Sequence, residues 1–283
     1  MELKDLMDLL DLEQIEMNHY RGVSPKTGWQ RVYGGQVLGQ ALVAASRTVE
    51  ADRPAHSLHG YFLRPGDTQV PILYRVERIR DGKSFTTRQV QAIQHGRPIF
   101  SMSISFQITE PGASHQFDMP DAPAPETLKD ETELRQEAMK KLPPEEREAF
   151  TRDRMMDVRP VNPQDMFNPE ATEPHHMTWM KSSETLPDDP RIHQCVLAYL
   201  SDWSLLDTAT RPHAISFMQD NLQVASLDHA MWFHRPFRAD EWLLYVQDSP
   251  SASGARGYNR GLIYTREGEL IASAVQEGLM RQH

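Results

Sequence analysis

Alternating apolar and polar residues mark the stretch around residue 100 as β-structure. Four large apolar residues alternate there with serines: Phe100, Met102, Ile104 and Phe106. Because successive side chains of a strand point to opposite faces, this pattern predicts an antiparallel sheet with one buried face. Two further strands are predicted over residues 71–80 and 84–92, joined by the turn signal Asp81-Gly82.

Other stretches show helical patterns. Residues 37–46, which follow Gly34, Gly35 and Gln36, are mostly apolar and rich in alanine. The run is too long for most strands, so it predicts a buried helix over residues 36–46. A second helix is predicted to begin at Pro190, with Asp189 as its cap. Its apolar stripe consists of Ile192, Val196, Tyr199, Trp203 and Leu206. Residues 1–18 place leucines at helical spacing among charges and predict an amphipathic helix.

An internal repeat organises these elements into two copies. Ser57–Gly66 reads SLHGYFLRPG, and Ser226–Phe237 reads SLDHAMWFHRPF, with the same Ser-Leu opening and a shared Arg-Pro pair near the end. Each copy leads into strand-like sequence that ends in a glycine turn and a last apolar strand, QHGRPIFSMSISF in the first and REGELIASAVQEG in the second. Such a duplication predicts two copies of one unit, each a long helix followed by antiparallel strands.

The segment between the copies is rich in proline. Residues 108–190 hold 12 of the 20 prolines, which predicts a connection across the surface with short helices over residues 131–141 and 144–151. Strand-like sequence resumes at His175–Lys181. The predicted organisation is a first unit at 1–110, a linker without chemistry at 111–174 and a second unit at 175–283.

The composition is typical of a globular protein in a reducing compartment. With 283 residues and 39% hydrophobic content, the chain can bury a large core. Its net charge of −10 argues against a surface built for nucleic acid or anionic membrane, so a polyanion would need a local basic pocket. The single cysteine, Cys195, cannot form an internal disulfide, which favours the cytoplasm. No run is apolar over the roughly 20 residues of a membrane span.

One acid stands in an unusual position. Asp202 falls on the edge of the apolar stripe of the second predicted helix, in helical register with Cys195 and Tyr199. An ionised carboxylate close to a core is costly without hydrogen-bond partners. Two interpretations stay open on spacing alone, because the carboxylate either reaches solvent at the helix edge or is held near the core for a function.

Several segments together resemble the acyl-CoA thioesterase II family: YGGQVLGQAL, HSLHGYFLRPGD, HAMWFHRPF, SASGARG and AVQEGLMR. The resemblance covers nearly the whole chain. It implies an α+β double hotdog, in which two tandem units each wrap a curved antiparallel sheet around one long central helix. It also implies an active site formed by Asp202, Ser226 and Gln276. Many similar sequences carry threonine at the middle position, and Ser226 keeps the hydroxyl.

These residue types suit hydrolysis of a thioester by water. A carboxylate such as Asp202 can accept the proton of the attacking water, while a hydroxyl and an amide hold the other contacts of that water. Gly34 and Gly35 begin the first predicted helix, whose free backbone N–H groups can bind a developing oxyanion. The first helix carries no acid, so one complete site per chain is expected.

Further candidates for substrate binding are His56, Arg64 and Arg256. His56 precedes a strand beside the expected site, where a structural imidazole is the commoner role. Four arginines of the two copies can meet coenzyme A phosphates, although ion pairs are their commoner use: Arg64, Arg88, Arg235 and Arg256. No metal or cofactor is expected, because the 12 histidines show no zinc-binding spacing. The chain also lacks a GxSxG nucleophile elbow.

The expected function is hydrolysis of fatty acyl-CoA to fatty acid and coenzyme A. Two alternatives stay open. A noncatalytic acyl-CoA sensor would need an output module, and no such module is evident. A hotdog hydratase or dehydratase would need a catalytic motif that combines an aspartate with a histidine, on a turn from a strand to a helix. The resemblance implies a homo-oligomer, either dimer or tetramer. The net charge and the lack of an apolar span predict no nucleic-acid or membrane partner, and the sequence leaves the acyl-chain length open.

Overall fold

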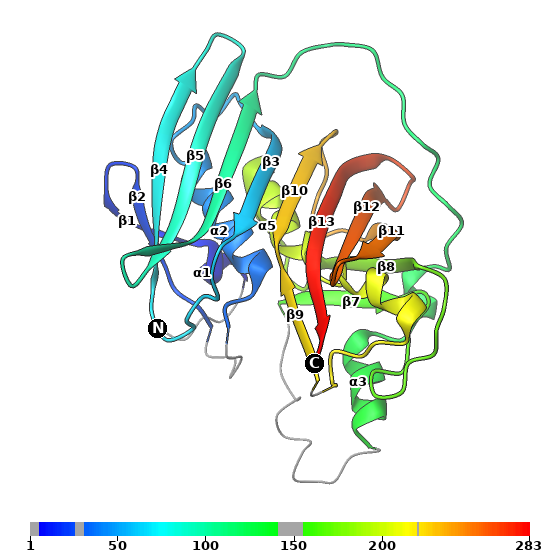
Figure 1. Ribbon diagram of the computed structural model, residues 1–283. Coiled ribbons are helices and arrows are strands. Elements are labelled where there is room, and N and C mark those ends of the chain that lie inside the picture. The colour runs from blue at the N-terminus through cyan, green and yellow to red at the C-terminus, as the bar shows by residue number, and fades with distance from the viewer. Residues whose placement is uncertain (1–5, 26–30, 141–154, 220) are drawn as a thin grey trace.

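The computed structural model describes residues 6–25, 31–140, 155–219 and 221–283 (Figure 1). In the first unit a sheet wraps around the central helix α2 (Gly34–Ser46), which buries most of its side chains. The strands of this unit are β1 (Glu13–Glu16), β2 (His19–Gly22), β3 (Ala55–Phe62), β4 (Ile72–Asp81), β5 (Phe85–Gln94) and β6 (Arg97–Gln107). The helix and the three strands predicted from periodicity are thereby confirmed.

The second unit repeats this plan around α5 (Pro190–Ser201). Pro190 occupies the first turn, and the Asp189 carboxylate caps the helix by accepting from the Arg191 N–H at 3.0 Å, as predicted. The strands are β7 (Met156–Pro160), β8 (His175–Ser182), β9 (Leu222–Ser226), β10 (Asp228–Phe233), β11 (Leu243–Ser253), β12 (Arg256–Thr265) and β13 (Leu270–Gln282). Short helices follow α5 at α6 (Asp207–Thr210) and η3 (Arg211–His213).

The two units share one continuous sheet and one core. The strands run in the order β1-β2-β4-β5-β6-β3-β10-β13-β12-β11-β8-β7, all antiparallel, with β9 paired to β13. The units join where β3 pairs with β10, with Leu58 opposite Met231. Figure 1 shows α2 and α5 on the same side of this sheet, and one cluster of buried side chains includes both helices. This architecture is the double hotdog that the repeat and the resemblance predict.

Glycines allow α2 and α5 to approach closely. A Cβ on Gly35 would overlap the carbonyl oxygen of Tyr199, and one on Gly39 would lie 3.0 Å from the carbonyl oxygen of Cys195. The amino end of α2 therefore lies against the carboxyl end of α5, so the two central helices are antiparallel. The Tyr33 hydroxyl strengthens this contact by donating to the Tyr199 carbonyl at 3.0 Å.

The amino-terminal segment differs from its prediction. Helix α1 (Leu6–Leu10) is short, and it is followed by the hairpin of β1 and β2 instead of a helix to residue 18. The chain reverses at Asn18, whose φ of 60° is a left-handed conformation that asparagine tolerates. The charged side chains at helical spacing therefore lie partly on an exposed edge strand, with Glu13 and Glu16 facing solvent.

The proline-rich linker does more than connect the units. Figure 1 shows it leaving β6, arching over the second unit and reaching α3 (Glu131–Met139), which confirms the first linker helix. Before α3 it forms the short turn η1 (Pro125–Thr127). The predicted helix over residues 144–151 lies outside the described residues. Strand β7 belongs to the segment assigned to the linker, yet it pairs with β8 and supplies an edge strand. None of the helices described here is long and apolar enough to cross a membrane.

We predict that Gly35→Ala strongly destabilises the protein. The added methyl group would overlap backbone that cannot move without separating the two central helices, and overpacking of this kind costs about 1–3 kcal/mol or more. Gly112→Ala is the matched control, because a Cβ there has nothing within 4 Å. Urea unfolding monitored by circular dichroism measures both changes, and equal midpoints for the two variants would contradict the close helix contact.

Candidate active site

Asp202 lies where the two central helices meet. It is the residue that follows α5, not a residue within a longer helix as the apolar stripe suggested, because α5 ends at Ser201. Its side chain is only 5% exposed, so the interpretation in which it reaches solvent is wrong. A Cβ on Gly34 would lie 2.6 Å from its Oδ2 atom. The carboxylate of the second unit is therefore enclosed by the first turn of the helix of the first unit.

Three donors surround this carboxylate. The Gln276 amide donates from Nε2 to Asp202 Oδ1 at 2.5 Å, and the Ser226 hydroxyl donates to the same oxygen at 3.4 Å. The backbone N–H of Gly35 donates the third hydrogen bond. The structure thus brings together the three residues predicted as catalytic, with Ser226 at the end of β9 and Gln276 on the inward face of β13.

Burial and hydrogen bonding act on Asp202 in opposite directions. Burial disfavours the charged form and raises the pKa of the carboxyl group to about 6, while the donors Gln276, Gly35 and Ser226 limit the rise. A carboxylate with a pKa near 6 is ionised at neutral pH and still holds a proton more readily than a solvated one. This balance suits a general base.

His229 is a residue of this site that sequence reasoning missed. It is fully buried on β10, and burial lowers its pKa to about 3, so it is neutral. The Ser201 hydroxyl donates to the carbonyl of Ala198 at 3.0 Å and can accept from His229 Nε2 at 2.9 Å. The Nδ1 atom then accepts from the Gln276 amide at 3.4 Å. We assign this tautomer from the network, and it orients the Gln276 amide toward Asp202.

Strand alternation contained a weak signal for His229. In the sequence it appeared only as one of a pair of histidines in HAMWFHRPF, without a metal-binding pattern. It alternates with the buried Met231 and Phe233, which places it on the inward face of β10, beside the β13 position of Gln276. His229 and Gln276 lie close together because β10 pairs with β13, and the sequence spacing of the two residues does not reveal this proximity.

A second buried acid lies near the site. Burial, with a smaller contribution from the negative charge of Glu131 in α3, raises the pKa of Asp207 to about 7. Glu131 also accepts a hydrogen bond from the indole of Trp203 at 3.0 Å. The linker therefore touches the residue next to Asp202, so part of it lies close to the chemistry.

The first unit carries different residues at the corresponding positions. Arg47 follows α2 as Asp202 follows α5, and it bonds to the carbonyl of Leu12 and to Asp11. Leu58 and its partner Ile104 stand on β3 and β6 where His229 and Gln276 stand on β10 and β13. These apolar and cationic side chains leave the first unit without an equivalent carboxylate or amide.

The other residues predicted to bind substrate are dispersed. His56 bonds through Nε2 to Ser105 Oγ at 2.8 Å and packs against Phe85, all within the first unit. Arg256 forms an ion pair with Glu277 at 2.9 Å. Glu277 neighbours Gln276 in sequence, but the two residues point to opposite faces of β13. Arg64 lies exposed at the end of β3.

Two further arginines and the single cysteine make contacts that stabilise the fold. Arg88 is buried and donates to Thr48 and to Asp81, the latter at 2.6 Å. Arg235 bonds to the linker at Ser114. Burial raises the pKa of the Cys195 thiol to about 12, which suppresses the reactive thiolate.

Comparison with known proteins identifies the family of the chain. Residues 24–107 match the family model described as acyl-CoA thioesterase N-terminal domain, and residues 145–279 match the model described as acyl-CoA thioesterase. The chain is 42% identical to acyl-CoA thioesterase 2 of Haemophilus influenzae over 279 residues, which covers 99% of this chain and 98% of that protein.

Solved structures give the same result. The fold is similar to the crystal structure of an acyl-CoA thioesterase II, TesB2, from Mycobacterium marinum, with 48% identity, a TM-score of 0.78 and coverage of 97% and 96% of the two chains. A protein of unknown function from Alicyclobacillus acidocaldarius with a hot dog fold is 17% identical with a TM-score of 0.76, over 97% of each chain, and supports the fold alone. The chain belongs to the acyl-CoA thioesterase II family.

Proposed function

We propose that this protein hydrolyses fatty acyl-CoA to a fatty acid and coenzyme A, with Asp202 as the general base. The observation that carries the proposal is the enclosed carboxylate between the two units, held by Gln276, Ser226 and Gly35. Relatives named acyl-CoA thioesterases over nearly the full chain support the same substrate class.

The proposed reaction uses water and no covalent intermediate. Asp202 accepts a proton from a water molecule while the oxygen of that water attacks the thioester carbonyl. The tetrahedral intermediate then collapses, the carbon–sulfur bond breaks, and the Asp202 proton passes to the departing thiolate. Backbone N–H groups in the first turn of α2 are the proposed oxyanion donors. The N–H of Gly35 already serves the carboxylate, which leaves Gly34 and Gln36 for that role.

The buried network explains why Gln276 is suited to hold the water. Its Nε2 atom donates to Asp202, whereas its Oε1 atom is buried without a hydrogen-bond partner among the described residues. An unpaired buried acceptor of this kind is costly, and a water that donates to it is stabilised. The side chain of Ser226 approaches the same carboxylate from β9.

The alternatives fit the site less well. A hydratase or dehydratase needs a histidine that can exchange protons with substrate, but His229 is fully buried behind Gln276 with its pKa lowered to about 3. A noncatalytic sensor has no need for a carboxylate that is held ionised in a buried position. We retain hydrolysis as the proposal for these reasons.

Three broader assignments accompany this proposal. We propose a homo-oligomer, dimer or tetramer, because the resemblance to the family implies one. We propose the cytoplasm, supported by a single cysteine that is buried and unpaired. The domain boundaries at 1–110, 111–174 and 175–283 stay a proposal, supported by the two hotdog units on either side of the linker.

Asp202→Asn tests the function. The amide keeps the shape of the side chain but is a poor base, so turnover of acyl-CoA is expected to fall about 10²–10⁴-fold. Release of free thiol from a panel of acyl-CoA thioesters measures this, with circular dichroism to establish that the variant is folded. An unaltered rate would remove Asp202 from the mechanism, and no hydrolysis of any thioester by the wild type would remove the function.

The pH dependence should report the raised pKa. Protonated Asp202 cannot accept a proton, so kcat/KM should fall about tenfold per pH unit below an apparent pKa of about 6. An acyl-N-acetylcysteamine thioester is the suitable substrate, because it has no phosphate that titrates in the same range. Asp207→Asn is the control for the second buried acid, and this variant should still show the decrease of kcat/KM at acidic pH. A profile that is flat down to pH 4 would contradict the assignment.

Ser226→Ala and Gln276→Ala should each lower kcat more than they raise KM, because both side chains are proposed to position the water. Their effects should not add, since residues that hold one water act as a unit. The double variant is expected to lose much less than the product of the single losses in steady-state kinetics. Strict multiplication of the two losses would show that they serve separate steps.

A further inference from the structure

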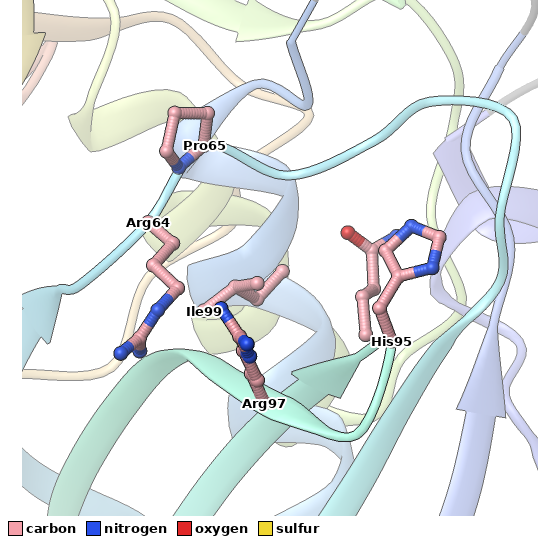
Figure 2. A pocket seen from close by; sticks show the side chains of 6 residues that line it. Arg64, Pro65, His95, Arg97 and Ile99 are labelled. Atoms are coloured by element: carbon pink, nitrogen blue, oxygen red, sulfur yellow. The ribbon is translucent and has the colours of Figure 1, made fainter.

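A basic pocket lies at the edge of the first unit, away from the carboxylate. It has a volume of about 340 Å³. It opens between the loop after β3 and the turn that joins β5 to β6, and Figure 2 shows the side chains around it. Its lining consists of Arg64, Pro65, Gln94, His95, Arg97 and Ile99. The protein carries a net charge of −10, so a pocket with two arginines and no acid in its lining is a local exception.

The charges of this pocket are available to a ligand. Arg64 donates through Nη1 to the Pro98 carbonyl at 2.6 Å, which positions its guanidinium at the rim. Arg97 is exposed at the start of β6, and neither arginine forms an ion pair within the described parts of the chain. The acid nearest to the lining is Asp67, which lies 3.3 Å from His95 and accepts from the backbone of Gln69.

The linker covers the corresponding position of the second unit. Arg235 donates through Nη1 to the Leu270 carbonyl at 2.7 Å, as Arg64 does to Pro98. Its Nη2 atom bonds to Ser114 Oγ of the linker at 3.1 Å. Gln116 then bonds to Gly268 and to Leu270, so the linker is fastened across this place.

The basic residues of the turn at the pocket are also specific to the first unit. The turn between β5 and β6 carries His95 and Arg97 around Gly96, whereas the turn between β12 and β13 carries Glu267 and Glu269 around Gly268. One copy of the duplicated turn is therefore basic and uncovered, and the other is acidic and covered by the linker. A merely structural role for the turn would not require this reversal of charge.

The pocket is connected to the active site by short lengths of chain. The Val32 N–H donates to the Gly66 carbonyl at 3.0 Å beside the pocket, and Gly34 begins α2 two residues later against Asp202. Two residues span at most ~7 Å, so the segment that contacts the loop beside the pocket also lies close to the carboxylate. The strand before that loop makes a second connection, because the Phe62 N–H donates to the Leu227 carbonyl, next to Ser226.

We propose that Arg64 and Arg97, with His95, bind a phosphate group of the coenzyme A part of the substrate. This assignment rests on the proposed hydrolysis of acyl-CoA. The pantetheine arm is an extended chain that separates the thioester from the phosphates, and a basic pocket beside the path to Asp202 is suited to the far end of such a molecule. Arginine binds phosphate through two parallel N–H donors, which a pair of guanidinium groups at one rim can supply.

Arg97→Gln is the sharpest test, because no described contact of the fold depends on the Arg97 side chain. It should raise KM for acyl-CoA about tenfold and leave kcat unchanged, since the phosphates are remote from the reacting carbonyl. Arg64→Gln should act in the same direction. Hydrolysis of the matching acyl-N-acetylcysteamine thioester, which lacks every phosphate, should be unaffected in both variants. Arg78→Gln is the control for loss of an exposed positive charge on β4, far along the strand from the pocket.

The outcomes separate this inference from the proposed function. If the wild type hydrolyses both thioesters and Arg97→Gln leaves KM for acyl-CoA unchanged, the pocket assignment is wrong while the function stands. An equal effect on both thioesters, or one matched by Arg78→Gln, also overturns it. An altered oligomeric state in gel filtration with an unchanged KM would instead assign the pocket to a contact between copies. Acyl-dephospho-CoA, which lacks the 3′-phosphate, then identifies the phosphate that is bound. If the variants and the wild type have the same KM for this substrate, the pocket binds the 3′-phosphate. If the KM values still differ, the pocket binds the diphosphate.

Discussion

The structure depends on holding one ionised carboxylate out of water. Asp202 follows the carboxyl end of α5, where the helix dipole disfavours a negative charge, and it faces the amino end of α2, where the dipole favours one. With a pKa raised to about 6, its ionisation opposes folding. The resulting loss in the free energy of unfolding is absent at pH values below the unfolded pKa of about 4, and it reaches about 3 kcal/mol above the folded pKa. The donors Gln276, Ser226 and Gly35 keep it from being larger.

The two copies of the duplicated unit each contribute one helix to the site: α5 ends just before Asp202, and the first turn of α2 encloses its carboxylate. Antiparallel packing of the two central helices brings the end of one against the start of the other. Gly35 and Gly39 allow this contact, and Gly34 leaves room for the Asp202 carboxylate. Gly34 and Gly35 are therefore required by packing and by electrostatics at once, because the absent side chains let backbone donors reach the carboxylate. The first unit places Arg47 after its own helix, so the duplicate position became a structural contact instead of a second site.

Much of this could be predicted from the sequence, and the failures have physical reasons. Phe100–Phe106 and Pro190–Ser201 follow local rules of alternation and capping, so their structures are visible without the fold. The motifs of the family supply Asp202, Ser226 and Gln276. His229 was missed because its importance comes from strand pairing between β10 and β13. Residues 13–22 form a hairpin because β2 pairs with β4, and this tertiary contact prevents the helix predicted from the leucines of residues 3–12 from continuing to residue 18.

The linker illustrates a further limit of sequence interpretation and a consequence of the duplication. Its proline content indicates an extended segment but not which copy it covers. By fastening Ser114 and Gln116 to the second unit, it covers one of two equivalent turns and leaves the other open. The active site lies at the junction of the units, so a substrate with a long polar end needs a binding surface on one side of that junction. The open side carries Arg64 and Arg97. On the covered side Arg235, the counterpart of Arg64, is bonded to the linker, and Glu267 and Glu269 take the place of His95 and Arg97. The uncovered basic turn of the first unit therefore favours one direction of approach for an anionic substrate. Such a substrate would bind along the first unit and reach the base in the second.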